Sequence, residues 1–245
     1  MKYFVKPNQV SYGEAIGIIL IENYVPFIPG DVANATTYNY PVRFHRVPGL
    51  SAERIFNHDM TLYTDILAAG RLLVKEGVRA ITGDCGFLAL FQKQLAEDLD
   101  VPVFLSSLLQ IPFILSIIAG TSKLGVITAN SKSLDKDVFD ALNIGSKQME
   151  RIVIGGLENS SHFVSSVFEE EGMLDSELME QETVEAARAL QRKNPELGSV
   201  LLECSLLPPY GKAVQEATGL PVFDFITMID YVFSAVVKKK YHGFM

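Results

Sequence analysis

Two stretches of the sequence have the same pattern: AITGDCGFLALFQKQLAEDLDVPVF at residues 80–104 and SVLLECSLLPPYGKAVQEATGLPVF at residues 199–223. They align without a gap at an offset of 119 positions, which superposes Cys85 on Cys204, the only cysteines of the chain. In each stretch an apolar strand leads to the cysteine, an amphipathic helix follows, and the sequence PVF begins a further strand. Such an internal repeat predicts a chain built from two similar halves.

The rest of the chain alternates short apolar runs with longer amphipathic segments. A second pair of matching strands, GIILIEN at residues 17–23 and GVITANS at residues 125–131, extends the repeat. The predicted strands are residues 15–21, 40–47, 79–84, 102–106, 123–129, 150–156, 198–203 and 221–225. The clearest predicted helices are residues 60–76, 88–98, 134–142, 176–193 and 210–218. Because strands that alternate with helices form βαβ units, the sequence predicts an α/β fold with parallel sheets.

The composition of the 245 residues is that of an ordinary globular protein, with 48% hydrophobic and 20% charged residues. The net charge of −8 argues against nucleic acid as a partner, because such binding needs clustered Lys and Arg. Residues 101–120 are uncharged and long enough to span a membrane, but prolines and polar residues divide them into a strand, a turn and a helix. We therefore predict no membrane segment and, without a signal peptide or a disulfide scaffold, a cytoplasmic protein.

No motif indicates a metal or a cofactor. His45, His58, His162 and His242 lack the spacing of metal ligands, and there is no Walker loop, GxGxxG turn or GxSxG elbow. His162 has two interpretations, an auxiliary acid–base group or a residue of a surface loop. We expect a protein without metal or cofactor that acts on a small molecule and can form a homo-oligomer.

Each cysteine follows a strand and precedes a helix, at the edge of an α/β sheet where ligands bind. A helix N-terminus lowers the pKa of a thiol, whereas the negative charges of Asp84 and Glu203, the residues before the cysteines, raise it. Alternation along the strand predicts that these carboxylates point away from the thiols. The cysteines can also be buried core residues or disulfide partners, but their equivalent positions in the repeat favour chemistry.

Two equivalent thiols that face one cleft suit proton transfer at a carbon atom. One thiolate removes a proton, and the other cysteine, as a thiol, delivers a proton to the opposite face. The pair shares one proton in the resting protein, so its titration belongs to the pair and not to either residue. This arrangement is that of racemisation or epimerisation by two bases.

These features resemble the aspartate/glutamate/hydantoin racemase superfamily. The resemblance rests on the cysteines in GDCGF (residues 83–87) and ECSLL (residues 203–207), on the GVITA strand and on PVF after each cysteine helix, and it covers nearly the whole chain. It implies two similar flavodoxin-like halves, related by a pseudo-twofold axis, with the active site in the cleft between them. It also implies catalysis by Cys85 and Cys204 without pyridoxal phosphate or metal.

The chain order of the same superfamily implies that the C-terminal segment returns to the first half. The predicted domains are therefore residues 1–100 together with residues 219–245, and residues 101–218.

The residues after the cysteines depart from the amino-acid racemases of this superfamily, which usually carry Cys-Asn-Thr and Cys-Thr-His. The corresponding residues here are Cys85-Gly86-Phe87 and Cys204-Ser205-Leu206. The apolar Phe87 and Leu206 indicate a substrate larger or more apolar than aspartate. The stretch VITAN resembles the arylmalonate decarboxylase branch, where the residue that matches Asn130 contacts a carboxylate, but that branch keeps only the second cysteine.

The predicted substrate-binding residues surround the cysteines: Asn23, Gly86, Phe87, Thr128, Asn130 and Ser205. Backbone N–H groups after each cysteine can hold a carboxylate and stabilise enolate-like charge, and Gly86 permits close approach. Thr128 and Asn130 alternatively cap the helix that follows their strand. Residues 24–41 form a long loop rich in Pro, Asn and Thr, and loops of this length often have a function.

The sequence therefore predicts a cofactor-independent racemase or epimerase that moves a proton at a carbon next to a carboxylate or amide, with an amino acid or a hydantoin-like compound as substrate. Two alternatives remain open. One is a decarboxylase or a cis–trans isomerase of a diacid in the same superfamily, and the other is a two-lobed binding protein without catalysis.

Overall fold

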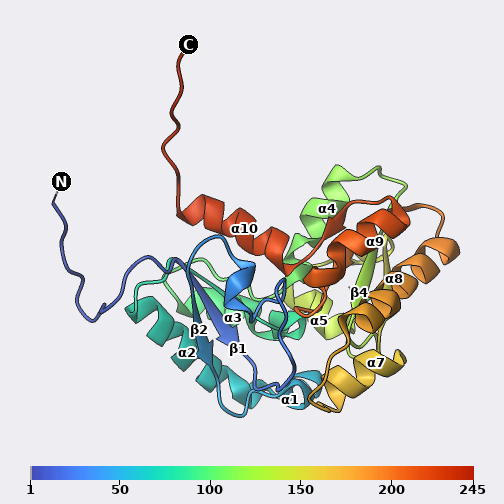
Figure 1. The fold of residues 1–245 in the computed structure, drawn as a ribbon, viewed down its shortest axis with the longest axis horizontal. Helices are drawn as coiled ribbons and strands as arrows, with labels where there is room; N and C mark the ends of the chain where they lie inside the picture. The colour runs from blue at the N-terminus through green and yellow to red at the C-terminus, as the bar shows by residue number, and fades with distance from the viewer. Residues whose placement is uncertain (1) are drawn as a thin grey trace.

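The strands of the computed structural model, which describes residues 2–245, form two parallel sheets (Figure 1). The first sheet has the order β2-β1-β3 and consists of β1 (Ile16–Leu20), β2 (Val42–Arg46) and β3 (Ala80–Gly83). The second has the order β5-β4-β6-β7 and consists of β4 (Lys123–Thr128), β5 (Ile152–Gly156), β6 (Leu197–Leu202) and β7 (Val222–Phe223). The predicted α/β fold with two similar halves is confirmed.

The two sheets repeat the same order of strands. β1 pairs with β2 and β3 as β4 pairs with β5 and β6, all in parallel. Val103 forms a single parallel bridge to Ile81 beside β3, at the place that β7 has beside β6. The carboxyl ends of β3 and β6 consequently have equivalent positions in their sheets, and the two cysteines follow these ends directly.

Helices cover both sheets. They are α1 (Ala52–Phe56), α2 (Tyr63–Lys75), α3 (Gln92–Asp98), α4 (Ile111–Ile117), α5 (Lys136–Ala141), α6 (Ser146–Met149), α7 (Ser161–Phe163), α8 (Ser176–Lys193), α9 (Gly211–Thr218) and α10 (Phe225–Val236). Short 3₁₀ turns are η1 (Ala35–Thr37), η2 (Met60–Leu62), η3 (Gly86–Phe91), η4 (Ser107–Gln110) and η6 (Pro208–Tyr210), and η5 (Val164–Phe168) is a π-turn.

Local sequence explains where the long helices begin and end. The carboxylate of Asp175 accepts hydrogen bonds from the first N–H groups of α8, which has the predicted bounds. Helix α10 is absent from the clearest sequence predictions, although a capping box of Asp224 and Thr227 starts it. Phe225 and Ile229 of α10 pack into the apolar cluster that also contains Ile16 and Ile18 of β1, so the helix lies on the first sheet.

The predicted domain boundaries fall close to paired segments. Val103 pairs within the first sheet and β7 within the second, so these pairings favour boundaries a few residues later than 100/101 and 218/219. The division into domains stays a prediction.

The uncharged stretch at residues 101–120 contains a bridge residue, the turn η4 and the short helix α4, as the sequence indicates. Among the described residues, no helix is long and apolar enough to cross a membrane.

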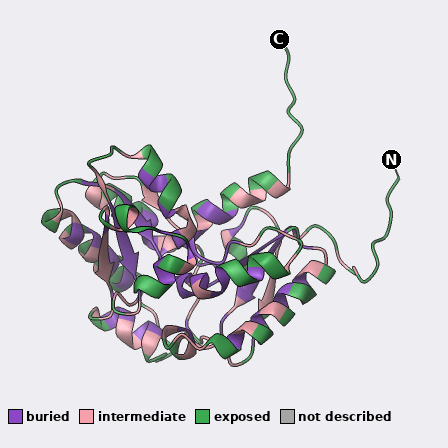
Figure 2. Ribbon diagram, turned by 180° about the vertical axis from the view of Figure 1, so that it is seen from behind, coloured by how far each residue is buried: buried purple, intermediate pink, exposed green. Residues whose placement is uncertain are grey.

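The core follows the strands, whose residues are mostly buried, while the helices expose one face (Figure 2). Ile16, Ile18 and Ile19 of β1 and Val126 and Ile127 of β4 are fully buried. Strands covered on both faces need continuous apolar runs, which these sequences supply. The rigid sheets therefore hold the two strand ends that carry the cysteines.

Candidate active site

Cys85 and Cys204 line the same cavity. Cys85 lies between the end of β3 and the start of η3, and Cys204 follows the end of β6. Both thiols are free and partly exposed. The prediction that the repeat brings the two cysteines to one cleft between the halves thus agrees with the geometry, and the disulfide alternative does not.

The cavity is small, about 40 Å³, which is space for a few water molecules. Its lining residues come from both halves of the chain. They are Ile21, Asn23, Phe27, Ala52, Phe56, Asp84, Cys85, Gly86, Phe87, Ala129, Val167, Phe168, Glu203, Cys204, Ser205 and Leu206. A groove of about 600 Å³ adjoins the cavity and shares Ala52, Phe56, Val167 and Phe168 with it. We call this groove the mouth of the cavity.

The two strand ends interlock across the halves. The hydroxyl of Ser205 donates a hydrogen bond to the backbone carbonyl of Asp84. In the reciprocal position Gly86 packs against Glu203: a Cβ on Gly86 would overlap the carboxyl Oε1, and would lie 2.5 Å from Cδ and 2.8 Å from the backbone oxygen. Glycine at this position therefore leaves the space that the Glu203 carboxyl fills.

Two buried carboxyl groups line the cavity beside the thiols. Asp84 is 4% and Glu203 1% exposed. Burial raises the pKa of each of them to about 7. The N–H of Ile21 donates to Asp84 Oδ1 at 2.9 Å, and the hydroxyl of Thr128 donates to Glu203 Oε2 at 2.7 Å, and both bonds partly counteract this effect. Glu203 Oε1 has no hydrogen-bond partner among the described residues.

The environment keeps both cysteines in the thiol form. Burial raises the pKa of the Cys85 thiol, and the negative charge of Glu203 raises it further. The same two causes, in the same order, raise the pKa of Cys204, with a smaller contribution from the charge of Cys85. Backbone N–H groups at the following turns work in the opposite direction, but less strongly. A thiolate in this cavity therefore needs an additional positive charge.

Three phenylalanine rings form one wall of the cavity. The ring of Phe56 meets that of Phe87 at 84°, with the ring centroids 4.8 Å apart. It meets the ring of Phe168 at 89° and 6.1 Å. Phe56 and Phe168 also line the mouth, so these two rings lie where the cavity and the groove meet.

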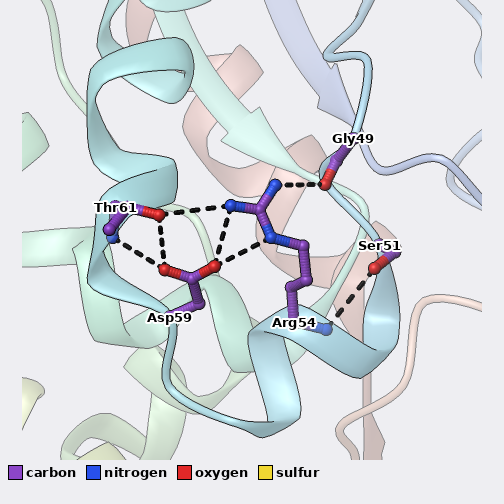
Figure 3. Close-up of polar contacts among 5 residues, drawn as sticks. All are labelled: Gly49, Ser51, Arg54, Asp59 and Thr61. Carbon is purple, nitrogen blue, oxygen red and sulfur yellow. Dashed lines mark hydrogen bonds and ion pairs between the residues drawn. The ribbon is translucent and has the colours of Figure 1, made fainter.

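An arginine network fixes the short helix that carries Phe56 (Figure 3). The Arg54 guanidinium donates to Asp59 Oδ2 at 2.8 Å, to the Gly49 carbonyl at 2.9 Å and to Thr61 Oγ1 at 3.2 Å. The Ser51 hydroxyl accepts the backbone N–H of Arg54 and caps α1. A planar guanidinium that binds three acceptors restricts both chain segments around α1, and therefore the position of Phe56.

The long loop at residues 24–41 belongs to the first half but contacts the second. The N–H of Val32 donates to the carbonyl of Ser205 at 3.4 Å, and Gly30 packs closely against Pro209. Phe27 of the same loop lines the cavity. The loop thus lies against the chain segment that follows Cys204.

Four of the predicted substrate-binding residues line the cavity: Asn23, Gly86, Phe87 and Ser205. The buried Oδ1 of Asn23 has no partner among the described residues. Asn130 lines only the mouth, where its Oδ1 accepts the N–H of Lys132 at 3.1 Å. This bond closes a turn, and the alternative that Asn130 caps the next helix is wrong, because α5 begins at Lys136 and is capped by Asp135. Thr128 is fully buried behind Glu203 and does not line the cavity, so its contact with a ligand is indirect.

His162 has neither of its two predicted environments. It is 9% exposed and lies outside the cavity lining. Its Nε2 accepts the backbone N–H of Asp175 at 2.8 Å and lies 3.3 Å from Ser166 Oγ. The surface-loop interpretation is wrong, because this ring is buried and connects α7 to the start of α8.

Of the described residues, one histidine has two carboxylates near it. His58 lies 3.7 Å from Asp135 and 3.8 Å from Asp137. The aspartates are exposed, the group lies outside the cavity lining, and its side chains come from distant parts of the sequence. Motif spacing could not reveal this group.

The sequence interpretation missed Asp84 and Glu203 as cavity residues. Alternation along a strand placed them away from the thiols, but both strands end before these positions, where alternation no longer fixes the side of a side chain. The available signal was the repeat itself, which aligns an acidic residue with an acidic residue directly before each cysteine.

Comparison with proteins of known activity gives several relatives of one kind. No family model matches the chain. It is 32% identical over 235 residues to "Dimethylsulfoniopropionate lyase" of Durusdinium sp. clade D, a match that covers 94% of this chain and 77% of the relative. It is 33% identical to "Dimethylsulfoniopropionate lyase 5" of Emiliania huxleyi (strain CCMP1516), covering 90% of this chain but only 45% of the relative.

Solved structures of racemases and a decarboxylase share the fold that the resemblance implied. Allantoin racemase from Pseudomonas fluorescens superposes with a TM-score of 0.59 at 15% identity, covering 93% of this chain and 100% of that one. Unliganded arylmalonate decarboxylase gives 0.57 at 16%, covering 93% and 94%. Picrophilus torridus aspartate racemase gives 0.56 at 14%, covering 94% and 96%. These identities show the fold alone, and racemase activity of this chain is not confirmed.

Proposed function

The chain belongs to the dimethylsulfoniopropionate lyase family, and from this premise we propose that it eliminates a sulfide from a small carboxylate that carries a β-sulfonium group. The observation that supports the proposal is a candidate base at a strand end, the thiol of Cys85 or Cys204, in a cavity lined by carboxyl groups and aromatic rings. The relatives are named lyases, and a decarboxylase is also a lyase. Their names therefore favour the decarboxylase alternative drawn from the sequence over racemisation. Elimination at a sulfonium was not among the reactions inferred from the sequence.

The reaction needs one base. A cysteine thiolate takes the proton from the carbon next to the carboxylate, and the electrons of that C–H bond form the carbon–carbon double bond. The bond from the β-carbon to sulfur breaks, and its electron pair leaves with the sulfur as neutral dimethyl sulfide. Acrylate is the second product, and the cysteine is left as a thiol. Because the leaving group is neutral, it requires no proton from a general acid.

The cavity of about 40 Å³ is smaller than this substrate, so we assign the reacting atoms to the cavity and the remainder of the substrate to the adjoining groove. We assign the substrate carboxylate, and the enolate-like charge that develops on it, to the backbone N–H groups after each cysteine and to the side chain of Asn23, which lines the cavity. The pKa of both thiols is raised in the empty cavity. The sulfonium of a bound substrate is the positive charge that lowers it, so thiolate forms mainly when substrate is present.

The test is direct. Purified protein incubated with dimethylsulfoniopropionate should release acrylate and dimethyl sulfide in equal amounts, detected by chromatography. Cys85→Ala and Cys204→Ala each remove one candidate base, and at least one of them should lose activity by a factor of about 10³ or more, as for a general base. Product formation at the wild-type rate in both single variants would contradict the proposed role of the cysteines.

A second function, racemisation or epimerisation, is favoured by one specific observation. Elimination uses a single base, whereas two cysteines at equivalent strand ends of one cavity suit transfer to both faces of a carbon. Amino acids and hydantoins in deuterated water distinguish the two functions. Deuterium at the α-carbon with inversion and without acrylate supports racemisation, and acrylate without inversion supports elimination.

A further inference from the structure

We propose that Glu203, with the phenylalanine rings beside it, forms a subsite for a methylated onium group. This inference rests on the proposed function, in which the onium group is a dimethylsulfonium, and it assigns that group a binding partner. The class of ligand is a small carboxylate with a permanently positive, methylated sulfur or nitrogen.

The charges around the cavity are the first support. Among the described residues, the charged side chains that line the cavity are those of Asp84 and Glu203, and those that line its mouth are Glu22, Glu53 and Glu170. All are carboxyl groups, and no Lys, Arg or His is among these lining residues. Carboxylates at an entrance raise the local concentration of cations and disfavour anions. This arrangement suits a ligand with a positive group and leaves its carboxylate to backbone N–H groups.

Of the two carboxyl groups that line the cavity, Glu203 has a buried oxygen without a hydrogen-bond partner among the described residues. Its Oε2 accepts the Thr128 hydroxyl, which fixes the orientation of the group. Its Oε1 has no partner among the described residues, the residue is 1% exposed, and it lines the cavity over Gly86. A buried carboxyl oxygen without a donor is costly, and a cation in the cavity would compensate it. A methylated onium offers charge without an N–H donor, so it needs no directed hydrogen bond.

The rings complete the subsite. Phe56, Phe87 and Phe168 meet at nearly right angles, and Phe27 lines the same cavity from the long loop. Aromatic walls around a methylated cation contribute a cation–π attraction, which is strongest when water is excluded. An apolar wall and one carboxylate are the two elements that distinguish a methylated cation from a neutral group of the same shape.

The experiment compares isosteric ligands that cannot undergo elimination, because a single carbon separates the two functional groups. The ligands are (dimethylsulfonio)acetate, (trimethylammonio)acetate and the neutral-tailed 3,3-dimethylbutanoate, and binding to the wild-type chain is measured by calorimetry. We expect both cations to bind at least about tenfold more tightly than 3,3-dimethylbutanoate. Equal binding of all three ligands, or no binding, overturns the proposal.

A second measurement is the number of protons released or taken up when a ligand binds. Because the pKa of Glu203 is about 7, a cation that ionises it should release a fraction of a proton at pH 7, visible as a dependence of the binding heat on the buffer. If Glu203 instead stays protonated and donates a hydrogen bond to the ligand carboxylate, the complexes of all three ligands take up a fraction of a proton from the buffer and form equally well, which contradicts an onium subsite.

Variants separate the subsite from general effects of a buried charge. Glu203→Gln should abolish the preference for cations and the proton release. Phe56→Leu should weaken the binding of the two cations more than the binding of 3,3-dimethylbutanoate. Asp31→Asn is the matched control, because Asp31 is equally buried, has its pKa raised to about 8 and does not line the cavity. It should keep the preference. The same loss in Asp31→Asn as in Glu203→Gln would overturn the assignment.

The outcome is independent of turnover. A preference for cations without any acrylate formation would retain the subsite and overturn only the lyase proposal. Acrylate formation without a preference for cations would do the opposite.

Discussion

The Ser205 hydroxyl donates a hydrogen bond to the backbone carbonyl of Asp84, so the residue after one cysteine holds the residue before the other. On the opposite side of the pseudo-twofold axis, Gly86 leaves the space that the Glu203 carboxyl fills. The two halves are therefore joined at the point where both thiols lie, and the geometry of the cavity depends on both contacts.

Removal of the Ser205 hydroxyl should weaken this contact between the two halves. We expect Ser205→Ala to lower the free energy of unfolding by about 1 kcal/mol or more, because a buried carbonyl loses its donor. Urea denaturation followed by circular dichroism measures the change. Ser234→Ala is the control, since that exposed hydroxyl bonds only to a carbonyl in its own helix, and it should change stability by less than about 0.5 kcal/mol. Equal effects of the two substitutions would contradict a stabilising role of the hydrogen bond between Ser205 and Asp84.

A side chain at residue 86 should displace Glu203. Gly86→Ala introduces a Cβ that overlaps the carboxyl, so we expect a loss of about 1–3 kcal/mol of stability together with most of the proposed lyase activity. Thermal unfolding and acrylate formation are the two measurements. Gly120→Ala is a suitable control, because nothing lies within 4 Å of its Cβ position. Wild-type activity in Gly86→Ala would show that the close packing has no functional role.

The stability of the fold should depend on pH through Glu203. Its pKa rises from about 4.5 to about 7 on folding, so its contribution is fully present below pH 4.5 and is lost as pH rises through 7. Between pH 4 and pH 8.5 the free energy of unfolding of the wild type, relative to that of Glu203→Gln, should fall by about 3 kcal/mol. Denaturant titrations at the two pH values test this.

A control for this pH effect is Glu216→Gln, which changes an exposed carboxylate on α9. Its stability relative to the wild type should not change between the two pH values. A constant difference between the wild type and Glu203→Gln would mean that the Glu203 carboxyl ionises in the folded chain as it does in water.

The cysteines should react slowly with alkylating reagents in the absence of substrate. Because the pKa of both thiols lies well above 8.5, the rate of iodoacetamide labelling should rise about tenfold per pH unit between pH 7 and pH 9. Mass spectrometry of tryptic peptides reports each cysteine separately. A rate that is already constant above pH 7 would show a thiolate in the resting protein. Slow labelling that no ligand alters would favour a binding protein without catalysis.

Much of the fold could be predicted from the sequence because its causes are local. Alternating strands and amphipathic helices, and a repeat that aligns residues 80–104 with residues 199–223, indicate two parallel α/β halves. The capped helix α8 has the predicted bounds. Helix α10 escaped prediction because it is apolar around much of its circumference, and its place on the first sheet depends on residues more than 200 positions away.

The site was predictable only in part. Cys85 and Cys204 and four of the six predicted binding residues line one cavity, since the carboxyl ends of parallel strands meet at one edge. Thr128 and Asn130 do not, because one supports Glu203 and the other lies at the mouth. The carboxyl groups of Asp84 and Glu203 were assigned to the wrong side of the strand ends, where alternation no longer applies.

The sequence by itself determined that two equivalent cysteines follow two equivalent strands, because hydrophobic periodicity and an internal repeat are properties of the chain. Only the tertiary structure decided what surrounds the thiols. It placed Glu203 over Gly86, Phe56 and Phe168 where the cavity and its mouth meet, and a loop of the first half against the second. These contacts join residues that are 100 or more positions apart, and their burial, which sets the charge of each group, exists only once the halves have packed together.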